Sequence, residues 1–111
     1  MESLRRKKDR PSVQMAPGAA RSILHSGEAL MLVRIEMSAG AGVPAHAHPH
    51  EQITHLVSGR VSFELDGKKM ELSPGDSVLM RADVPHGATA IEDSVLIDAF
   101  SPPRSDFLES E

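Results

Sequence analysis

The chain has 111 residues, a formal net charge of −4 and no cysteine. This length supports one hydrophobic core, and the absence of cysteine excludes disulfide bridges and thiolate ligands, so any bound metal must be held by nitrogen and oxygen atoms. No apolar run approaches the roughly 20 residues that span a bilayer, and no apolar segment follows the basic N-terminus as in a signal peptide, so we expect a cytoplasmic protein without membrane contacts.

The N-terminal segment differs from the rest of the chain in charge. Its first ten residues, MESLRRKKDR, contain five of the 12 Lys and Arg residues but two of the 16 Asp and Glu residues. A basic segment can bind nucleic acid or attach to a DNA-binding partner, but this one has no aromatic residue to stack on bases, and the chain has no helix-turn-helix pattern. We therefore predict a flexible basic tail over residues 1–14, one domain over residues 15–111 and no nucleic-acid partner.

Short strands separated by turns are predicted along the domain. Residues 29–37 alternate, with four apolar side chains on one face and charged side chains between them, which is typical of a half-buried strand. Residues 61–65 repeat this period of two, and Asp66-Gly67 supplies the positive φ angles of a tight hairpin before a strand that ends near Leu72. The apolar positions of the first strand are Met31, Val33, Ile35 and Met37.

The second half of the chain continues the pattern of short strands. Residues 76–80 and 94–100 are apolar runs bounded by Pro and Gly, and no helical periodicity extends beyond two turns. Residues 101–111 are expected to be extended and to end in a short helical turn. Many short strands with turn signals between them indicate an all-β sandwich or closed barrel.

Histidine is concentrated in the middle of the chain. Four of the six histidines lie within residues 46–55, and three of them share parity with Gln52, so that in an extended strand all four side chains point to one face. Two imidazoles at positions i and i+2 can approach one ion together, and a further ligand can come from His86, the one histidine in the second half. The competing interpretation is a solvated strand face. The histidines of equal parity are His46, His48 and His50.

The segment around these histidines resembles the first sequence motif of the cupin superfamily. That motif consists of a glycine, His-x-His, an acidic residue and a second glycine at characteristic spacings. Residues 40–59 (GAGVPAHAHPHEQITHLVSG) are similar to it, with Gln52 where most cupins have glutamate. Residues 73–86 (SPGDSVLMRADVPH) match the second motif loosely, and Ala90 stands where asparagine is usual. The resemblance implies an all-β cupin fold, a double-stranded β-helix or jelly-roll barrel in a single domain.

The same resemblance implies one divalent metal ion inside the barrel. Three neutral imidazoles suit Fe, Ni, Mn, Zn or Cu better than Mg or Ca, which prefer oxygen ligands. A neutral carboxamide in place of a carboxylate leaves the ion its full charge, which favours Lewis-acid chemistry over storage. We expect His50 at the rim of this site and His55, which has the opposite parity to Gln52, in packing or in a contact between sheets. The implied ligands are His46, His48, Gln52 and His86.

A second group of candidate residues lies in DAFSPPR, residues 98–104. Periodicity alone slightly favours a solvent-facing Asp98. Together with HAHPHEQ, however, this segment is similar to the small cupins called pectin degradation proteins, whose implied activity is the linearisation of 4,5-unsaturated monouronates from pectin or alginate. The resemblance implies catalytic roles for Asp98, Phe100 and Arg104.

Each of these residues has a physical role under that interpretation. Arg104 offers a planar fork for the uronate carboxylate, and Asp98 moves a proton between oxygen and the enol carbon. Phe100 shapes the pocket and keeps water out. The contribution of the metal is to stabilise negative charge as the ring opens. The expected product is a linear keto form, reached by ring opening and tautomerisation without redox change.

Other functions use the same residue types. A non-haem metal dioxygenase, or an isomerase acting on another small molecule, also needs three histidines and open coordination positions. A non-catalytic sugar-binding or sensing cupin is a further alternative. We expect a small-molecule substrate, with an unsaturated sugar acid favoured, and a homodimer that pairs through an edge strand or an exchanged N-terminal strand.

Overall fold

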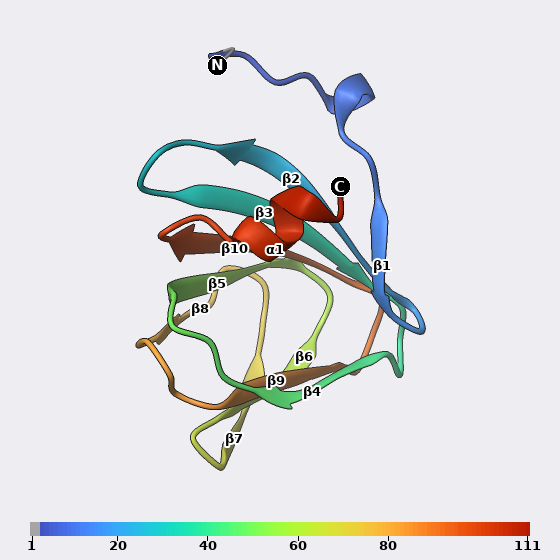
Figure 1. The fold of residues 1–111 in the computed structure, drawn as a ribbon. Helices are drawn as coiled ribbons and strands as arrows, with labels where there is room; N and C mark the ends of the chain where they lie inside the picture. Colours follow the sequence, from blue (N-terminus) through green and yellow to red (C-terminus); the bar gives the residue numbers. More distant parts are fainter. Residues whose placement is uncertain (1–2) are drawn as a thin grey trace.

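The computed structural model describes residues 3–111, whose strands form two antiparallel sheets that face each other (Figure 1). In chain order the strands are β1 (Val13–Ala16), β2 (Ala19–Ser26), β3 (Met31–Met37), β4 (Gly42–His46), β5 (Glu51–Ser58), β6 (Val61–Leu65), β7 (Lys68–Leu72), β8 (Ser77–Met80), β9 (His86–Ala90) and β10 (Ser94–Ser101). The six-stranded sheet has the order β1-β2-β3-β10-β5-β8, and the four-stranded sheet has the order β4-β9-β6-β7. Because the chain passes repeatedly from one sheet to the other, the fold is a jelly-roll barrel. The predicted fold class is confirmed.

Apolar side chains from both sheets fill the barrel. The alternation predicted for β3 is confirmed, since Met31 and Val33 are fully buried while Glu36 is exposed. From the other sheet, β6 contributes the buried Val61 and Phe63. Burying one apolar side chain of this size stabilises a fold by about 1.5–3 kcal/mol. The period of two in the sequence therefore builds the core that holds the two sheets together.

The turn between β6 and β7 is the predicted tight hairpin. Asp66 and Gly67 have φ angles of 50° and 82°, the left-handed conformation that a two-residue hairpin of this kind requires. The strands on either side pair in continuous register from Val61 with Leu72 to Leu65 with Lys68. The predicted end of the second strand at Leu72 is confirmed.

The histidine-rich segment does not form one continuous strand. β4 ends at His46 in the four-stranded sheet, residues 47–50 form a loop, and β5 begins at Glu51 in the six-stranded sheet. Equal parity in one extended strand is therefore the wrong reason for bringing His46 and Gln52 together. They approach each other because the chain crosses from one sheet to the other between them.

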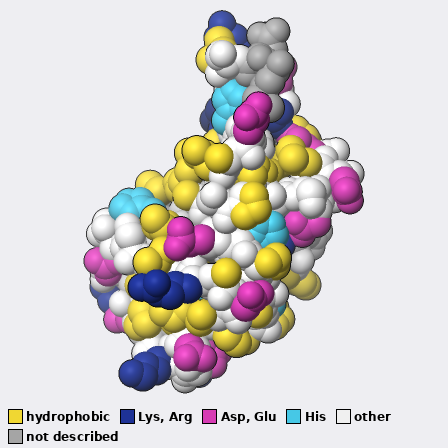
Figure 2. Space-filling view, turned by 60° about the vertical axis from the view of Figure 1, so that its left-hand side comes forward, with side chains coloured by type: hydrophobic (Ala, Val, Ile, Leu, Met, Phe, Trp, Pro, Cys, Tyr) yellow, Lys and Arg dark blue, Asp and Glu magenta, His cyan; other side chains and the backbone are white. Residues whose placement is uncertain are grey.

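The N-terminal segment contacts the C-terminus through an ion pair between Arg5 and Glu111. The N-terminal segment, with a short 3-10 helix at Lys7–Asp9, projects beyond the barrel (Figures 1 and 2). β1 begins at Val13, inside the segment predicted as a tail; Met1 and Glu2 lie outside the described residues, and the flexibility of the tail stays a prediction. The predicted C-terminal helical turn is α1 (Ser105–Glu109).

Within residues 3–111, no helix has the length and apolar character needed to cross a bilayer.

Candidate metal centre and active site

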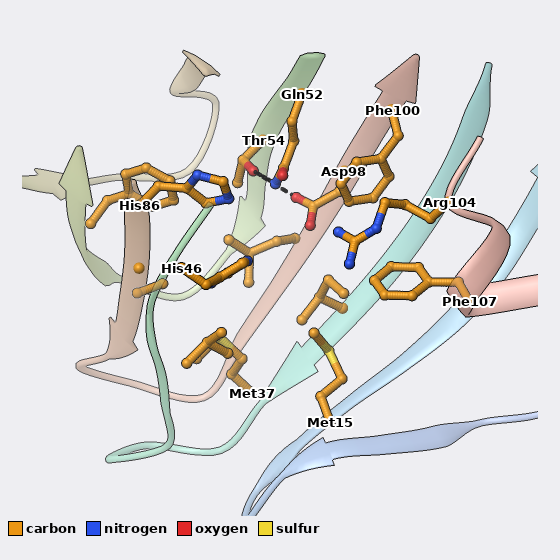
Figure 3. Close-up of a pocket in the computed structure, with 16 residues that line it drawn as sticks. Met15, Met37, His46, Gln52, Thr54, His86, Asp98, Phe100, Arg104 and Phe107 are labelled. Atoms are coloured by element: carbon orange, nitrogen blue, oxygen red, sulfur yellow. Dashed lines mark hydrogen bonds between the residues drawn. The ribbon is translucent and has the colours of Figure 1, made fainter. Parts of the chain in front are cut away.

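A cavity between the two sheets contains most of the residues singled out in the sequence. Its empty volume is about 650 Å³, open solvent at its mouth included. Figure 3 shows polar side chains gathered on one side of it and apolar ones, such as Met15 and Met37, on another. The polar side chains that line it are His46, Gln52, Thr54, His86, Asp98 and Arg104.

Three histidines from different segments converge at the polar side of this cavity: His46 and His86 line it, and His48 lies next to them. His46 ends β4, His48 lies in the following loop, and His86 begins β9. Ring nitrogens of the three lie within 4.8 Å of one another. The ring of His86 is 4.5 Å from that of His46 and 4.8 Å from that of His48, measured between centroids. The structure thus brings together three imidazoles that can share one metal ion.

Backbone hydrogen bonds orient two of these imidazoles. Nδ1 of His46 donates to the carbonyl oxygen of Pro44, and Nδ1 of His86 donates to that of Val84, each over 2.9 Å. This is the arrangement that metal-binding histidines adopt, because it leaves the Nε2 lone pair free for the ion. Nε2 of His86 is buried, and within the described residues it has no hydrogen-bond partner. These residues therefore fit a metal ion.

The third histidine contacts the predicted amide ligand. Nε2 of His48 lies 2.9 Å from Oε1 of Gln52. Two ligand atoms at right angles around one transition-metal ion, with bonds of about 2.1 Å, are about 3 Å apart. The contact between His48 and Gln52 is a hydrogen bond in this structure, and its length also suits two neighbouring ligands of one ion. The structure brings the predicted ligand set together, and the role of its members as ligands stays a prediction.

Burial keeps two of the histidines uncharged. The pKa of His48 is lowered to about 4. Desolvation is the largest cause, and the positive charge of the nearby Arg104 guanidinium is the second. Desolvation also lowers the pKa of His86. An imidazole binds a metal through an unprotonated nitrogen. Both side chains are consequently in the form that binds metal at neutral pH.

Asp98 faces the cavity and not the solvent, although periodicity alone favoured the solvated face. It lies on β10 directly opposite Thr54 of β5. Oγ1 of Thr54 donates to Oδ1 of Asp98 over 2.7 Å and accepts from Nε2 of Gln52 over 2.9 Å (Figure 3). Burial raises the pKa of Asp98 to about 6, against the opposing effects of these hydrogen bonds and of Arg104. A carboxyl group with this pKa can both accept and donate a proton near neutral pH.

Thr54 is a site residue that the sequence analysis did not identify. Its side chain is 2% exposed and joins a predicted ligand to a predicted catalytic residue. One signal was present, because Thr54 has the same parity as Gln52 in β5 and so shares its face. Its proximity to Asp98, however, follows from the register of β5 and β10, which no local pattern specifies.

Arg104 brings a positive charge to the same cavity. Its guanidinium lies 5.2 Å from the ring of Phe100 and 4.2 Å from that of Phe107, measured to the ring centroids. Nε and Nη2 donate to the carboxylate of Asp106 over 3.0 and 2.9 Å. Nη1 makes no hydrogen bond within the described part of the chain, and Figure 3 shows the guanidinium directed toward Asp98. One edge of the guanidinium is thus held by Asp106, and the other is open to a ligand.

The other two histidines of the cluster, like His48, are not among the residues that line the cavity. The ring of His50 is 5.2 Å from that of His48, and its Nδ1 is buried without a partner among the residues described. The expected place of His50 at the rim of the site stays a prediction. Nδ1 of His55 lies 2.6 Å from the hydroxyl oxygen of Ser77, so the contact recorded for this side chain joins β5 to β8 within one sheet.

The fold and the site together define a jelly-roll barrel with a histidine-lined internal cavity. The cupin domain family matches residues 33–99 of the chain. The pectin degradation protein KdgF of Dickeya dadantii (strain 3937) is 35% identical over 100 residues, which cover 88% of this chain and 91% of that protein. The chain therefore belongs to the cupin family.

Solved structures agree with this assignment. The structure of KdgF from Halomonas sp. has a TM-score of 0.89 and 37% identity, and the match covers 96% of this chain and 99% of that one. An RmlC-like cupin from Shewanella frigidimarina has a TM-score of 0.90 and 34% identity, with 96% of each chain covered. The prediction of a small cupin that resembles the pectin degradation proteins is confirmed.

Proposed function

We propose that the protein is a metal-dependent enzyme that converts 4,5-unsaturated monouronates, sugar acids released from pectin or alginate, to their linear keto forms. The observation that carries the proposal is a cavity lined by two histidines, a carboxamide, a buried carboxyl group and a guanidinium, with a third histidine beside the first two. The similarity to proteins named as pectin degradation protein KdgF supports the choice of substrate.

The proposed reaction is an isomerisation in which one proton moves. In the cyclic substrate, C4 and C5 share a double bond and the ring oxygen joins C5 to the anomeric carbon C1. Loss of the proton of the C1 hydroxyl breaks the bond between C1 and the ring oxygen, which leaves an aldehyde at C1 and an enolate at C5. Protonation of C4 then gives a ketone at C5. Atoms and electrons balance without an oxidant or reductant.

Asp98 is the candidate for moving this proton. Thr54 donates to Oδ1 of Asp98, so Oδ2 is left for the substrate. As a carboxylate, Asp98 accepts the proton of the C1 hydroxyl, and as an acid it returns a proton to C4. A pKa of about 6 makes both forms accessible near neutral pH.

Arg104 is the candidate for binding the uronate carboxylate. A guanidinium binds a carboxylate through two parallel N–H groups. Asp106 occupies Nε and one N–H of Nη2, so the edge formed by Nη1 and the second N–H of Nη2 is left for the substrate. Binding of the substrate to this edge does not require Asp106 to leave.

The other side chains of the cavity supply the environment for these steps. Phe100 and Phe107 lie side by side, with ring centroids 5.7 Å apart, and form an apolar wall beside Arg104. Such a wall excludes water and strengthens the electrostatic interactions next to it. A divalent metal held by His46, His48, Gln52 and His86 would supply Lewis-acid stabilisation of negative charge on substrate oxygen.

A direct assay tests the proposal. The protein is loaded separately with Fe, Ni, Mn or Zn, its metal content is measured, and unsaturated galacturonate is added. We expect loss of the conjugated absorbance faster than the spontaneous rate, and we expect Arg104→Ala to raise KM strongly. Absence of acceleration with every loaded metal would contradict the proposal. Consumption of oxygen would then favour a dioxygenase, and saturable binding of the sugar acid without product would favour a sensing protein.

The cellular location and the oligomeric state are part of the same proposal. We propose action in the cytoplasm on a small sugar acid, by a homodimer. The outward-facing side chains of β5 and β8 include Ile53 and Leu79, which pair in register and are 46% and 47% exposed, and such neighbouring apolar groups favour association. Light scattering during gel filtration distinguishes a dimer from a 12.0 kDa monomer.

A further inference from the structure

Gln52 differs from the other proposed ligands because its side chain has two unlike ends. The carbonyl oxygen of a carboxamide can face a cation, whereas the NH2 group has no lone pair to offer and carries partial positive charge. A glutamate at the same position would present an oxygen in either orientation. A site that uses glutamine therefore needs something that fixes which end faces the metal.

The hydrogen bonds around Thr54 determine this orientation. A threonine hydroxyl has one proton to donate, and its oxygen has lone pairs that can accept. The proton of Thr54 is used in the 2.7 Å bond to Oδ1 of Asp98. At its oxygen Thr54 can only accept, and the group that donates to it over 2.9 Å is Nε2 of Gln52. With the amide nitrogen held there, Oε1 of Gln52 lies 2.9 Å from His48.

The barrel protects this chain of hydrogen bonds from water. Thr54 is 2% exposed and Gln52 5%, and Asp98 is also buried. Thr54 and Asp98 are register partners on β5 and β10, while Gln52 precedes Thr54 by two residues on the same face. Strand pairing therefore fixes all three positions, and no competing donor from solvent reorients the amide.

We infer that Thr54 is a positioning residue that holds the Gln52 carboxamide with its oxygen toward His46, His48 and His86, and so raises the affinity of the site for a divalent metal. The inference rests on the ligand set of the proposed function and not on the identity of the sugar. Groups that orient metal ligands typically contribute a factor of about 10–100 in metal affinity. A threonine that served only packing would affect stability and leave the metal site unchanged.

A double-mutant cycle separates these two roles. Thr54→Val keeps the shape of the side chain and removes the hydroxyl, and Thr54→Ser keeps the hydroxyl. Each is made in the natural chain and in Gln52→Glu, where either carboxylate oxygen can face the metal. The dissociation constant for Co(II) is measured by competition with a chelating dye, and the visible absorption of bound Co(II) reports its ligands. Should Thr54→Val fail to fold, Thr54→Ala enters the same cycle.

The expected results are as follows. Thr54→Val weakens Co(II) binding about tenfold or more and changes the Co(II) spectrum, while Thr54→Ser stays within about threefold of the natural chain. In the Gln52→Glu background, Thr54→Val has an effect of about threefold or less. Two results overturn the inference: unchanged affinity and spectrum in Thr54→Val, or the same loss in both backgrounds. Because no sugar is present, failure of the uronate assay leaves this result intact, whereas failure of the natural chain to bind Co(II) overturns the inference together with the proposed ligand set.

Discussion

Strands β3 and β5 flank β10 in the same sheet, and both turn alternate side chains into the barrel. The two strands differ in the polarity of these inward side chains. The inward positions of β3 are apolar throughout, whereas β5 turns Gln52 and Thr54 inward before Leu56. A buried polar group without a partner costs about 1–3 kcal/mol. On β5 that cost is offset by the hydrogen bonds to Asp98 and His48. Within one sheet, the inward side chains of β3 therefore stabilise the fold, and the polar inward side chains of β5 line the candidate site.

The largest effect on activity is expected among the polar residues of the cavity, at Asp98. Asp98→Asn removes the proposed acid and base, so kcat for the unsaturated uronate should fall by about 10²–10⁴. The metal content should not change, because the asparagine oxygen can still accept the hydrogen bond from Thr54. Steady-state kinetics and elemental analysis of the same preparations test both statements. If activity is retained, or if metal is lost in parallel with activity, Asp98 does not have the proposed role.

The same carboxyl group should make stability depend on pH. Its pKa is raised from 3.8 to about 6 in the folded protein, so its contribution to stability is fully present below about pH 4 and is lost as the pH rises through about 6. A shift of this size corresponds to about 3 kcal/mol. Asp98→Asn should therefore gain up to about 3 kcal/mol relative to the natural chain between pH 4 and pH 7.

Urea unfolding at several pH values measures this difference. Both proteins are stripped of metal first, because a bound cation favours the carboxylate and would reduce the shift. The control is Asp93→Asn, at an exposed carboxyl group near the opposite end of β10. A difference between the natural chain and Asp98→Asn that stays constant from pH 4 to pH 7 would show that Asp98 is not desolvated as described.

A substitution on β3 should lower the stability of the fold and leave the metal site and the kinetics unchanged. Val33 is 0% exposed and lies beside Asp98 in the register of β3 and β10. Val33→Ala removes two buried methyl groups and leaves a cavity, so the free energy of unfolding should fall by about 2 kcal/mol. Metal affinity and KM should stay within about twofold. A loss of metal affinity as large as that of Thr54→Val would mean that the two strands do not divide their roles in this way.

The smallest effect is expected at the mouth of the cavity. Asp106 holds one edge of Arg104, but its side chain is 60% exposed, and exposed ion pairs of this kind contribute about 1 kcal/mol or less. Asp106→Ala should therefore raise KM about fivefold or less and leave kcat unchanged. Glu109→Ala, at another exposed acid of α1, is the matched control. A large fall in kcat for Asp106→Ala would indicate a direct role of this carboxylate in the reaction.

Local patterns in the sequence predicted β3, β6, β7, β8 and β10 and the inner face of β3, but they did not predict β1, β2 or β9. The alternation around Val33 and the Asp66-Gly67 turn depend on neighbouring residues alone, and the structure has both as predicted. The resemblance of the histidine motif to cupins also gave the correct fold family. These features are determined within a few residues, so a single sequence contains enough information to find them.

Features that depend on strand register were not predictable in the same way. Parity placed His46 and Gln52 on one strand, whereas they lie in different sheets on either side of a loop. The contact between Thr54 and Asp98 joins residues 44 positions apart. Periodicity also gave Asp98 a solvated face, because it shows which side chains share a face and does not show which face is buried.

We propose that His46, His48, Gln52 and His86 hold one metal ion. Anomalous diffraction from crystals of the Ni(II)-loaded protein, collected on both sides of the nickel absorption edge, can locate that ion. We expect one strong peak per chain, bounded by the three imidazoles and the Gln52 oxygen. A peak bounded by other residues, or none in crystals whose nickel content is one ion per chain, would contradict it.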